Sequence, residues 1–80
     1  MTTFERLIDV FNAVFEEDTN IDVSAINESS HLINDIGLNS IGMLYMAMAI
    51  EEEFEIKFQN DDFKMLATMG DVITLIESKA

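Results

Sequence analysis

The chain has no cysteine, no proline and no tryptophan, and it has one histidine and three glycines among its 80 residues. Without cysteine, neither a disulfide nor a thiolate site can form, so any thiol chemistry must come from a cofactor. With His31 as the single imidazole, a metal site lacks a plausible ligand set, and none is expected. No apolar run approaches the ~20 residues that a membrane-spanning helix needs.

Basic residues are also scarce. Four Lys and Arg stand against sixteen Asp and Glu, which gives a net charge of −12. This charge argues against nucleic acid as a partner, because phosphates would be repelled. Disorder is disfavoured because 49% of the residues are hydrophobic. We expect one folded domain over residues 1–80 with basic protein partners, and the lack of a signal-peptide pattern at Met1–Arg6 predicts a cytoplasmic location.

Apolar residues recur at helical spacing in several stretches. The first follows Thr2-x-x-Glu5, a capping box that predicts a helix start, and its stripe consists of Phe4, Leu7, Ile8, Phe11, Val14 and Phe15. A second helix is expected from about Ser40 to Phe54. Asn60 is a plausible cap for a brief third helix. A fourth begins at Thr68-x-x-Asp71, with the stripe Met69, Val72, Ile73 and Ile76.

The connection over residues 18–39 is long for so small a domain. Its apolar residues are numerous enough to fix it onto the core: Ile21, Val23, Ile26, Leu32, Ile33, Ile36 and Leu38. The predicted fold class is therefore all-α, a four-helix bundle with a long first loop and a short third helix.

The stretch Asp35–Ser40 places a glycine turn and then a serine where the second helix begins. A serine there can cap the helix, since its oxygen accepts a free backbone N–H. It can also carry an anion, because the helix dipole and the unpaired N–H groups favour negative charge. Local chemistry favours the cap but leaves both readings open. A Ser40–His31–Asp35 catalytic triad is disfavoured, because His31 would have to fold back from an irregular loop, where we expect it to be solvated.

The pattern Asp-x-Gly-x-Asn-Ser-Ile, followed by an apolar helix that ends in Glu-Glu-Glu-Phe, resembles the phosphopantetheine-attachment motif of acyl carrier proteins. The resemblance covers nearly the whole chain. It implies that Ser40 carries 4′-phosphopantetheine, taken from coenzyme A, whose thiol holds acyl groups as thioesters. Asp35, Gly37, Asn39 and Ile41 would frame this cofactor site. The protein would then be a carrier and not an enzyme.

The same resemblance implies the partners of a carrier. These are a phosphopantetheinyl transferase and acyltransferase, ketosynthase-type or acyl-activating enzymes with basic docking surfaces. We expect the carrier itself to be a monomer. Tyr45, Met48 and Glu52 share one outward face, and we expect docking there and at Glu51. Methionine suits a surface that adapts to several partners. The equal alternative is that Tyr45 and Met48 pack at the border of the core. Carboxylates at a helix C-terminus oppose the dipole, so stability does not explain the run from Glu51 to Glu55.

The inner face of the second helix is predicted from spacing. It consists of Leu44, Ala47, Ile50 and Phe54, flanked by Met43 and Met46. In the family, the acyl chain can fold back into a cavity beside the second and third helices. The matching residues are Met46, Ile50, Phe58, Phe63, Leu66, Met69 and Val72. Because phenyl rings at Phe58 and Phe63 take up volume, we expect a short cargo.

Departures from the family pattern bear on the pathway. Asn39 replaces the more frequent aspartate, and Gly42 and Tyr45 stand where many fatty-acid carriers have acids. This favours a specialised pathway, such as polyketide synthesis, over fatty-acid synthesis. The alternatives are an aminoacyl or peptidyl carrier, whose frequent Gly-Gly-x-Ser is missing here, and a helical adaptor without a covalent cofactor.

Overall fold

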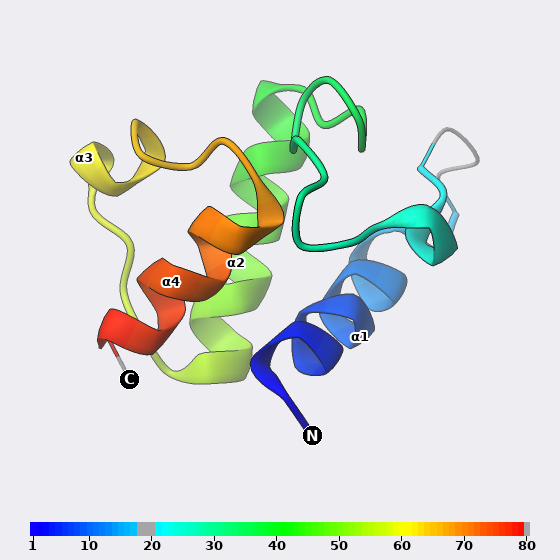
Figure 1. Ribbon diagram of the computed structural model, residues 1–80. Coiled ribbons are helices and arrows are strands. Elements are labelled where there is room, and N and C mark those ends of the chain that lie inside the picture. The colour runs from blue at the N-terminus through cyan, green and yellow to red at the C-terminus, as the bar shows by residue number, and fades with distance from the viewer. Residues whose placement is uncertain (18–20, 80) are drawn as a thin grey trace.

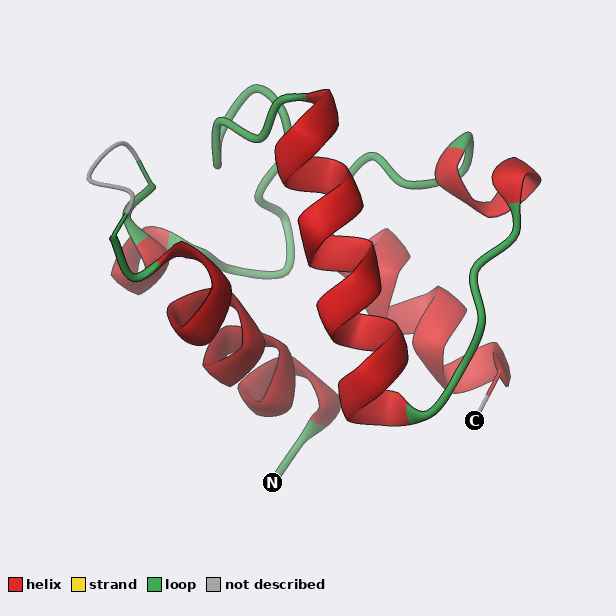
Figure 2. Cartoon of the chain, turned by 180° about the vertical axis from the view of Figure 1, so that it is seen from behind, coloured by secondary structure: helices red, strands yellow, loops and turns green. Residues whose placement is uncertain are grey.

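The computed structural model describes residues 1–17 and 21–79 (Figure 1). Its elements are the helices α1 (Thr3–Phe15), α2 (Ser40–Phe54), α3 (Asn60–Phe63) and α4 (Met69–Lys79), with a 3₁₀ turn, η1 (Val23–Ala25), in the first loop. Figure 2 shows helices and loops throughout the described residues, in which one isolated antiparallel bridge joins His31 and Thr68. The predicted all-α class, with a long first loop and a short third helix, is confirmed.

Helix α1 begins as its capping box predicts. The Thr2 hydroxyl oxygen accepts the Glu5 N–H at 3.1 Å, and the Glu5 carboxylate accepts the Thr2 N–H at 2.9 Å. The buried face consists of Leu7, Val10, Phe11 and Phe15. Val10 was missing from the predicted stripe, whereas Phe4, Ile8 and Val14 are only partly buried.

The first loop lies on the core, as its apolar residues predicted. Ile21, Leu32, Ile36 and Leu38 are buried. Ile33 was predicted to join them, and this is wrong, because its side chain is 56% exposed. It lies in a tight turn in which the Asp35 and Ile36 N–H groups both donate to the His31 carbonyl. The predicted connection also includes residues 18–20, which lie outside the described residues.

Backbone hydrogen bonds fasten the loop to the start of α4. The Leu32 N–H donates to the Ala67 carbonyl at 2.8 Å, and the Met69 N–H donates to the Ser30 carbonyl at 3.0 Å. A third bond joins the Gly70 N–H to the Glu28 carbonyl at 2.8 Å. These bonds position the segment that leads into α2.

Helix α2 has the predicted bounds, but its buried face differs from the prediction. Met46, Ala47 and Ile50 are buried, whereas Leu44 is 55% exposed. The prediction of Leu44 as an inner residue is therefore wrong, and Met46 belongs to the core and not to its flank. Because α2 is apolar on almost every side of its first three turns, spacing alone does not indicate which side faces α1 and α4.

The sequence-based prediction of the helix start is wrong for α3 and confirmed for α4. The residue before α3 is Gln59, whose N–H donates to the Asp62 carboxylate at 2.7 Å, and Asn60 is the first helical residue instead of the predicted cap. At α4 the predicted box is confirmed. The Asp71 carboxylate accepts the Thr68 N–H at 3.0 Å, and the Thr68 hydroxyl accepts the Asp71 N–H at 3.3 Å.

Candidate functional site

The segment before α2 is held in a fixed turn. The Asp35 carboxylate accepts the backbone N–H of His31 at 2.7 Å and so ties the two ends of the turn together. Gly37 follows with φ at +92°, a left-handed conformation that L side chains rarely adopt. Asp35 and Gly37, both predicted to frame the cofactor site, thus shape the loop that delivers Ser40.

Asn39, and not Ser40, is the cap of α2. Its side-chain oxygen accepts the Gly42 N–H at 2.7 Å, and its carbonyl accepts the Met43 N–H at 2.8 Å. Ser40 is the first helical residue and is exposed. The reading of Ser40 as a cap is therefore wrong. Among the described residues no hydrogen bond engages its hydroxyl, which leaves the oxygen available for a covalent bond.

The first turn of α2 contains no acidic residue. The third helical position, where a capping box places a carboxylate, is Gly42. The first turn of α2 therefore supplies no carboxylate to offset the positive end of the helix dipole. A phosphodiester on the first residue of such a helix lies where negative charge is stabilised.

His31 does not form a triad with Ser40. Its Nδ1 accepts the backbone N–H groups of Ile33 at 3.2 Å and Asn34 at 3.1 Å, so this ring nitrogen is engaged within its own loop. The carboxylate of Asp35 bonds the His31 backbone instead of the ring. The expectation of a solvated His31 is corrected, because the residue is half-buried and pairs with Thr68. The described residues contain no cluster of potential metal ligands.

An apolar surface runs along α2 from the residue next to Ser40. We call it the outer stripe, and it consists of Ile41, Leu44, Tyr45 and Met48. The first three residues are 63%, 55% and 56% exposed, and Met48 is 56% exposed. Tyr45 and Met48 point outward as expected. Leu44 was missed, because its spacing placed it in the core. Contiguous exposed apolar side chains commonly mark a contact surface.

Two of the acids at the end of α2 make contacts within the chain. The Glu51 carboxylate is half-buried and accepts the Phe58 N–H at 2.7 Å. Glu53 pairs with Arg6 at 3.0 Å, and the Arg6 guanidinium lies 4.2 Å above the centre of the Phe54 ring. Glu51 and Glu53 therefore have partners within the chain that the spacing did not indicate, whereas no such partner engages Glu52 among the described residues.

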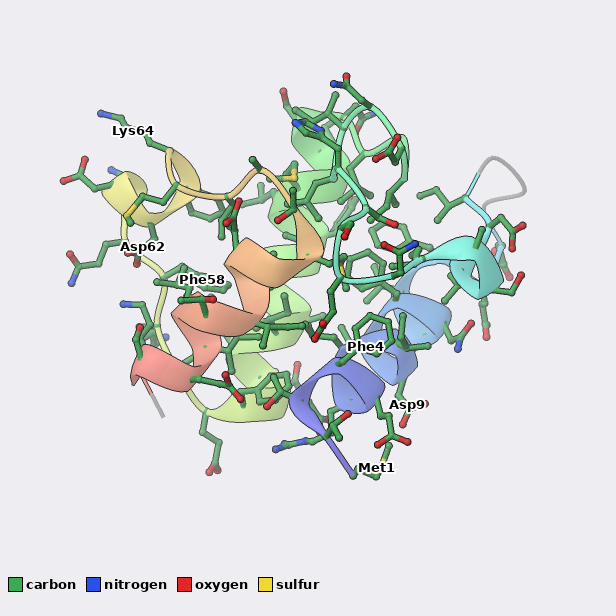
Figure 3. All side chains as sticks on the ribbon, viewed as in Figure 1. Met1, Phe4, Asp9, Phe58, Asp62 and Lys64 are labelled. Atoms are coloured by element: carbon green, nitrogen blue, oxygen red, sulfur yellow. The ribbon has the colours of Figure 1, made fainter. Side chains whose placement is uncertain are left out.

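The residues predicted to line an acyl pocket lie in or against a single core cluster. Met46, Ile50, Met69 and Val72 are fully buried, and Leu66 is nearly so. Phe58 and Phe63 are partly buried, with ring centres 5.8 Å apart and planes inclined by 58°. Figure 3 places Phe58 beside α4, on the side of the molecule that carries α3. The structure brings the seven residues together, and their role as a pocket stays a prediction.

Comparison with known proteins indicates the class to which the chain belongs. A family model described as a phosphopantetheine attachment site matches residues 9–76. The acyl carrier protein of Exiguobacterium sp. is 38% identical, over 99% of both chains. The one from Thermotoga maritima is 29% identical over 99% of this chain and 98% of its own. A third, from Sulfurovum sp., is 33% identical over 90% of this chain and 96% of its own.

The fold and the match define a carrier that bears a prosthetic group, and not an enzyme. The chain belongs to the acyl carrier protein family. Its cofactor is covalently attached 4′-phosphopantetheine, and a phosphopantetheinyl transferase and acyl-handling enzymes are its partners. Within the part of the chain that the structure describes, no helix is long and apolar enough to cross a membrane.

Proposed function

We propose that Ser40 is the residue that carries 4′-phosphopantetheine. One observation carries the proposal: Asn39 caps α2 and leaves the Ser40 hydroxyl exposed at a helix start without acidic residues. The serine oxygen can therefore take the phosphate without giving up a structural hydrogen bond. Once the carrier docks, a flexible arm on Ser40 gives the bound acyl group a high effective concentration at the partner enzyme.

We also propose that the enzymes that act on the arm dock on the outer stripe, and that Glu52, near the other end of α2, is a docking acid for a separate partner. The stripe begins beside Ser40, so an enzyme that reaches the arm must come close to it. Glu51 was expected to share this role, but its carboxylate already accepts the Phe58 N–H. Docking of these enzymes therefore combines apolar burial near Ser40 with the screened attraction of a basic surface to the net charge of −12, which suits transient binding.

For the pathway, we propose specialised acyl metabolism such as polyketide synthesis. Support comes from the uncharged outer stripe and from Gly42, since the first turn of α2 contains no acid. Fatty-acid synthesis is the second candidate, because the full-length relatives carry the general name acyl carrier protein. An aminoacyl or peptidyl cargo is the remaining alternative for the same arm. Monomeric state and cytoplasmic location stay predictions from the sequence.

The attachment is tested by intact mass after incubation with coenzyme A and a broad-specificity phosphopantetheinyl transferase. The unmutated chain and Ser29→Ala gain one phosphopantetheine, whereas Ser40→Ala gains none. Because Ser40 is not the cap, we expect its replacement to change the free energy of unfolding by less than about 0.5 kcal/mol. Modification of a folded Ser40→Ala variant contradicts the assignment.

The cargo is tested with acyl forms of increasing chain length. We expect the amide NMR shifts of Ile50, Leu66 and Val72 to stop changing after short chains, because the Phe58 and Phe63 rings occupy the space. We expect Phe63→Ala to extend the range of acyl chain lengths over which these shifts change. This substitution lowers the free energy of unfolding by less than the ~3–5 kcal/mol that loss of a fully buried ring costs. Phe4→Ala, which truncates a partly buried ring on α1, is the matched control and leaves the range unchanged. Shifts that grow steadily with length in the unmutated chain refute a short cargo.

A further inference from the structure

A groove of about 240 Å³ lies between α1 and α2. Its apolar lining consists of Val10, Ala13, Val14 and Ala49. We call it the α1–α2 groove. The two helices lie side by side in both ribbon views (Figures 1 and 2). Two alanines among the lining residues leave room for a side chain supplied from outside.

The groove has carboxylates on both of its sides. Asp9 comes from α1, and Glu52 and Glu53 come from α2. Both Asp9 and Glu52 are exposed. None of the lining residues is basic. An apolar floor between carboxylates is complementary to a side chain with an aliphatic stem and a cationic end, which means arginine or lysine.

One carboxylate of the groove, that of Glu53, already binds an arginine, Arg6, which is not itself a lining residue. Arg6 donates through Nη2 to the carboxylate of Glu53 at 3.0 Å and to its carbonyl at 3.0 Å, while its guanidinium lies 4.2 Å above the Phe54 ring. This internal arginine engages a carboxylate that borders the groove. Asp9 and Glu52 offer the same chemistry to an arginine from another protein, because a guanidinium can donate several hydrogen bonds to carboxylates.

The groove is also remote from Ser40. Glu52 follows Ser40 by twelve positions on the same helix, which corresponds to about 18 Å along the axis. A partner seated beside Glu52 on the α1 side therefore leaves the arm exposed to a second protein. Since the groove runs between two helices, it favours a helical occupant whose side chains recur on one face.

We propose that the α1–α2 groove docks an arginine-bearing amphipathic helix of a partner protein, which holds the carrier while another enzyme acts on Ser40. The arginine stem packs on the apolar floor, and its guanidinium bridges Asp9 and Glu52. Burial of the apolar floor and charge pairing act together, so the interaction differs from a general attraction to the net charge of −12.

The probe is a synthetic helix of Ala and Leu, about four turns long, with arginines at i and i+4. A matched peptide carries glutamine in place of arginine. Each is titrated into the ¹⁵N-labelled full chain while amide shifts are followed. We expect the arginine peptide to shift Val10, Ala13 and Ala49 most strongly. The glutamine peptide binds at least tenfold more weakly, which is ~1.4 kcal/mol or more.

Variants locate the contact. The pair Asp9→Asn and Glu52→Gln is expected to lower affinity for the arginine peptide about tenfold. The control pair Glu28→Gln and Asp61→Asn removes the same charge, from −12 to −10 (−12 + 2), at exposed positions away from the groove, and it leaves affinity almost unchanged. Ala13→Leu fills the groove without altering charge and is expected to abolish binding.

Several results overturn the proposal. Affinity for the arginine peptide that falls equally in the two double variants would overturn it, as would similar affinity for the arginine and glutamine peptides. Amide shifts centred on Ile41 and Tyr45 would place the peptide on the outer stripe instead. Amide shifts that change with protein concentration in the absence of peptide would also overturn it. The last would mean that a second copy fills the groove. A transferase must also still modify Ser40 with the peptide bound, and inhibition would contradict the separation of the two sites. Ser40 modification without peptide is measured in all variants, so failure of the groove is distinguishable from failure of the attachment site.

Discussion

The starts of α1, α3 and α4 differ in one respect from the start of α2. In each of the first three, the third helical residue is an acid whose carboxylate accepts the N–H of the residue three positions back, and these acids are Glu5, Asp62 and Asp71. In α2 the third helical residue is Gly42, and the cap is the neutral side chain of Asn39.

The physical consequence is a difference in charge at the helix ends. Backbone N–H donors at Thr2, Gln59 and Thr68 hold the pKa of Glu5, Asp62 and Asp71, respectively, below its ordinary value. The dipoles of these three helices therefore meet a carboxylate of the chain itself. Although the protein has a net charge of −12, the first turn of α2 contains no carboxylate, and this favours the binding of a phosphate there.

Removing the cap of α2 is the strongest test of this comparison. Asn39→Ala deletes the oxygen that accepts the Gly42 N–H, and we expect it to lower the free energy of unfolding by ~0.5–2 kcal/mol. Ser40→Ala, the neighbouring control, changes it by less than about 0.5 kcal/mol. Urea unfolding of both variants measures the two values. If Ser40→Ala costs as much as Asn39→Ala, then Ser40 shares the cap and the comparison fails.

The second test adds a carboxylate to the first turn of α2. Gly42→Glu adds the missing acid, and Gly42→Gln adds the same shape without charge. A Cβ at this position meets the Asn39 side-chain oxygen at 3.3 Å in both variants, so this crowding cancels between them. We expect Gly42→Glu to take up phosphopantetheine more slowly than Gly42→Gln by about two- to fivefold, from ~0.3–1 kcal/mol of lost attraction for the phosphate.

The measurement is the initial rate of mass gain with coenzyme A and the transferase at low salt. Added salt should reduce the difference between the two variants, because the charges are exposed and screened. Equal rates for the glutamate and glutamine variants at low salt would falsify the claim that the acid-free start assists attachment.

Acid titration gives the smallest expected effect. A carboxyl group whose pKa is lower in the folded state stabilises the fold above its ordinary pKa, and it loses this contribution as the pH falls through the folded-state value. The Asp71 contribution should therefore be present at neutral pH and fade below about pH 4. The α2 cap has no titrating group, so Asn39 should hold the Gly42 N–H throughout.

Amide NMR shifts between neutral and acidic pH separate the two kinds of helix start. We expect the Thr68 amide to titrate as the Asp71 carboxylate takes up a proton, and the Gly42 amide to stay nearly constant. Asp71→Asn is the control in which the Thr68 titration disappears. A Gly42 amide that titrates with the same midpoint as Thr68 would show that a carboxylate also acts on the α2 start.

The sequence by itself determined the features that depend on near neighbours. The boxes at Thr2–Glu5 and Thr68–Asp71 were predicted because their hydrogen bonds join residues three positions apart. The bounds of α2 and the place of Ser40 at its start followed from the glycine turn and the helical run after it. Asn60 failed as a cap because Gln59 and Asn60 are both polar, and one step of register separates them.

Only the tertiary structure decided which way the residues of α2 face. Leu44 and Met46 are both apolar, and their different exposure follows from which side of the helix faces α1 and the rest of the core cluster. The acids after Ile50 likewise depended on distant partners, because Glu53 pairs with Arg6 from 47 positions away and Glu51 accepts the Phe58 N–H. A local pattern records spacing along one helix, whereas burial and ion pairing depend on what the rest of the chain brings against it.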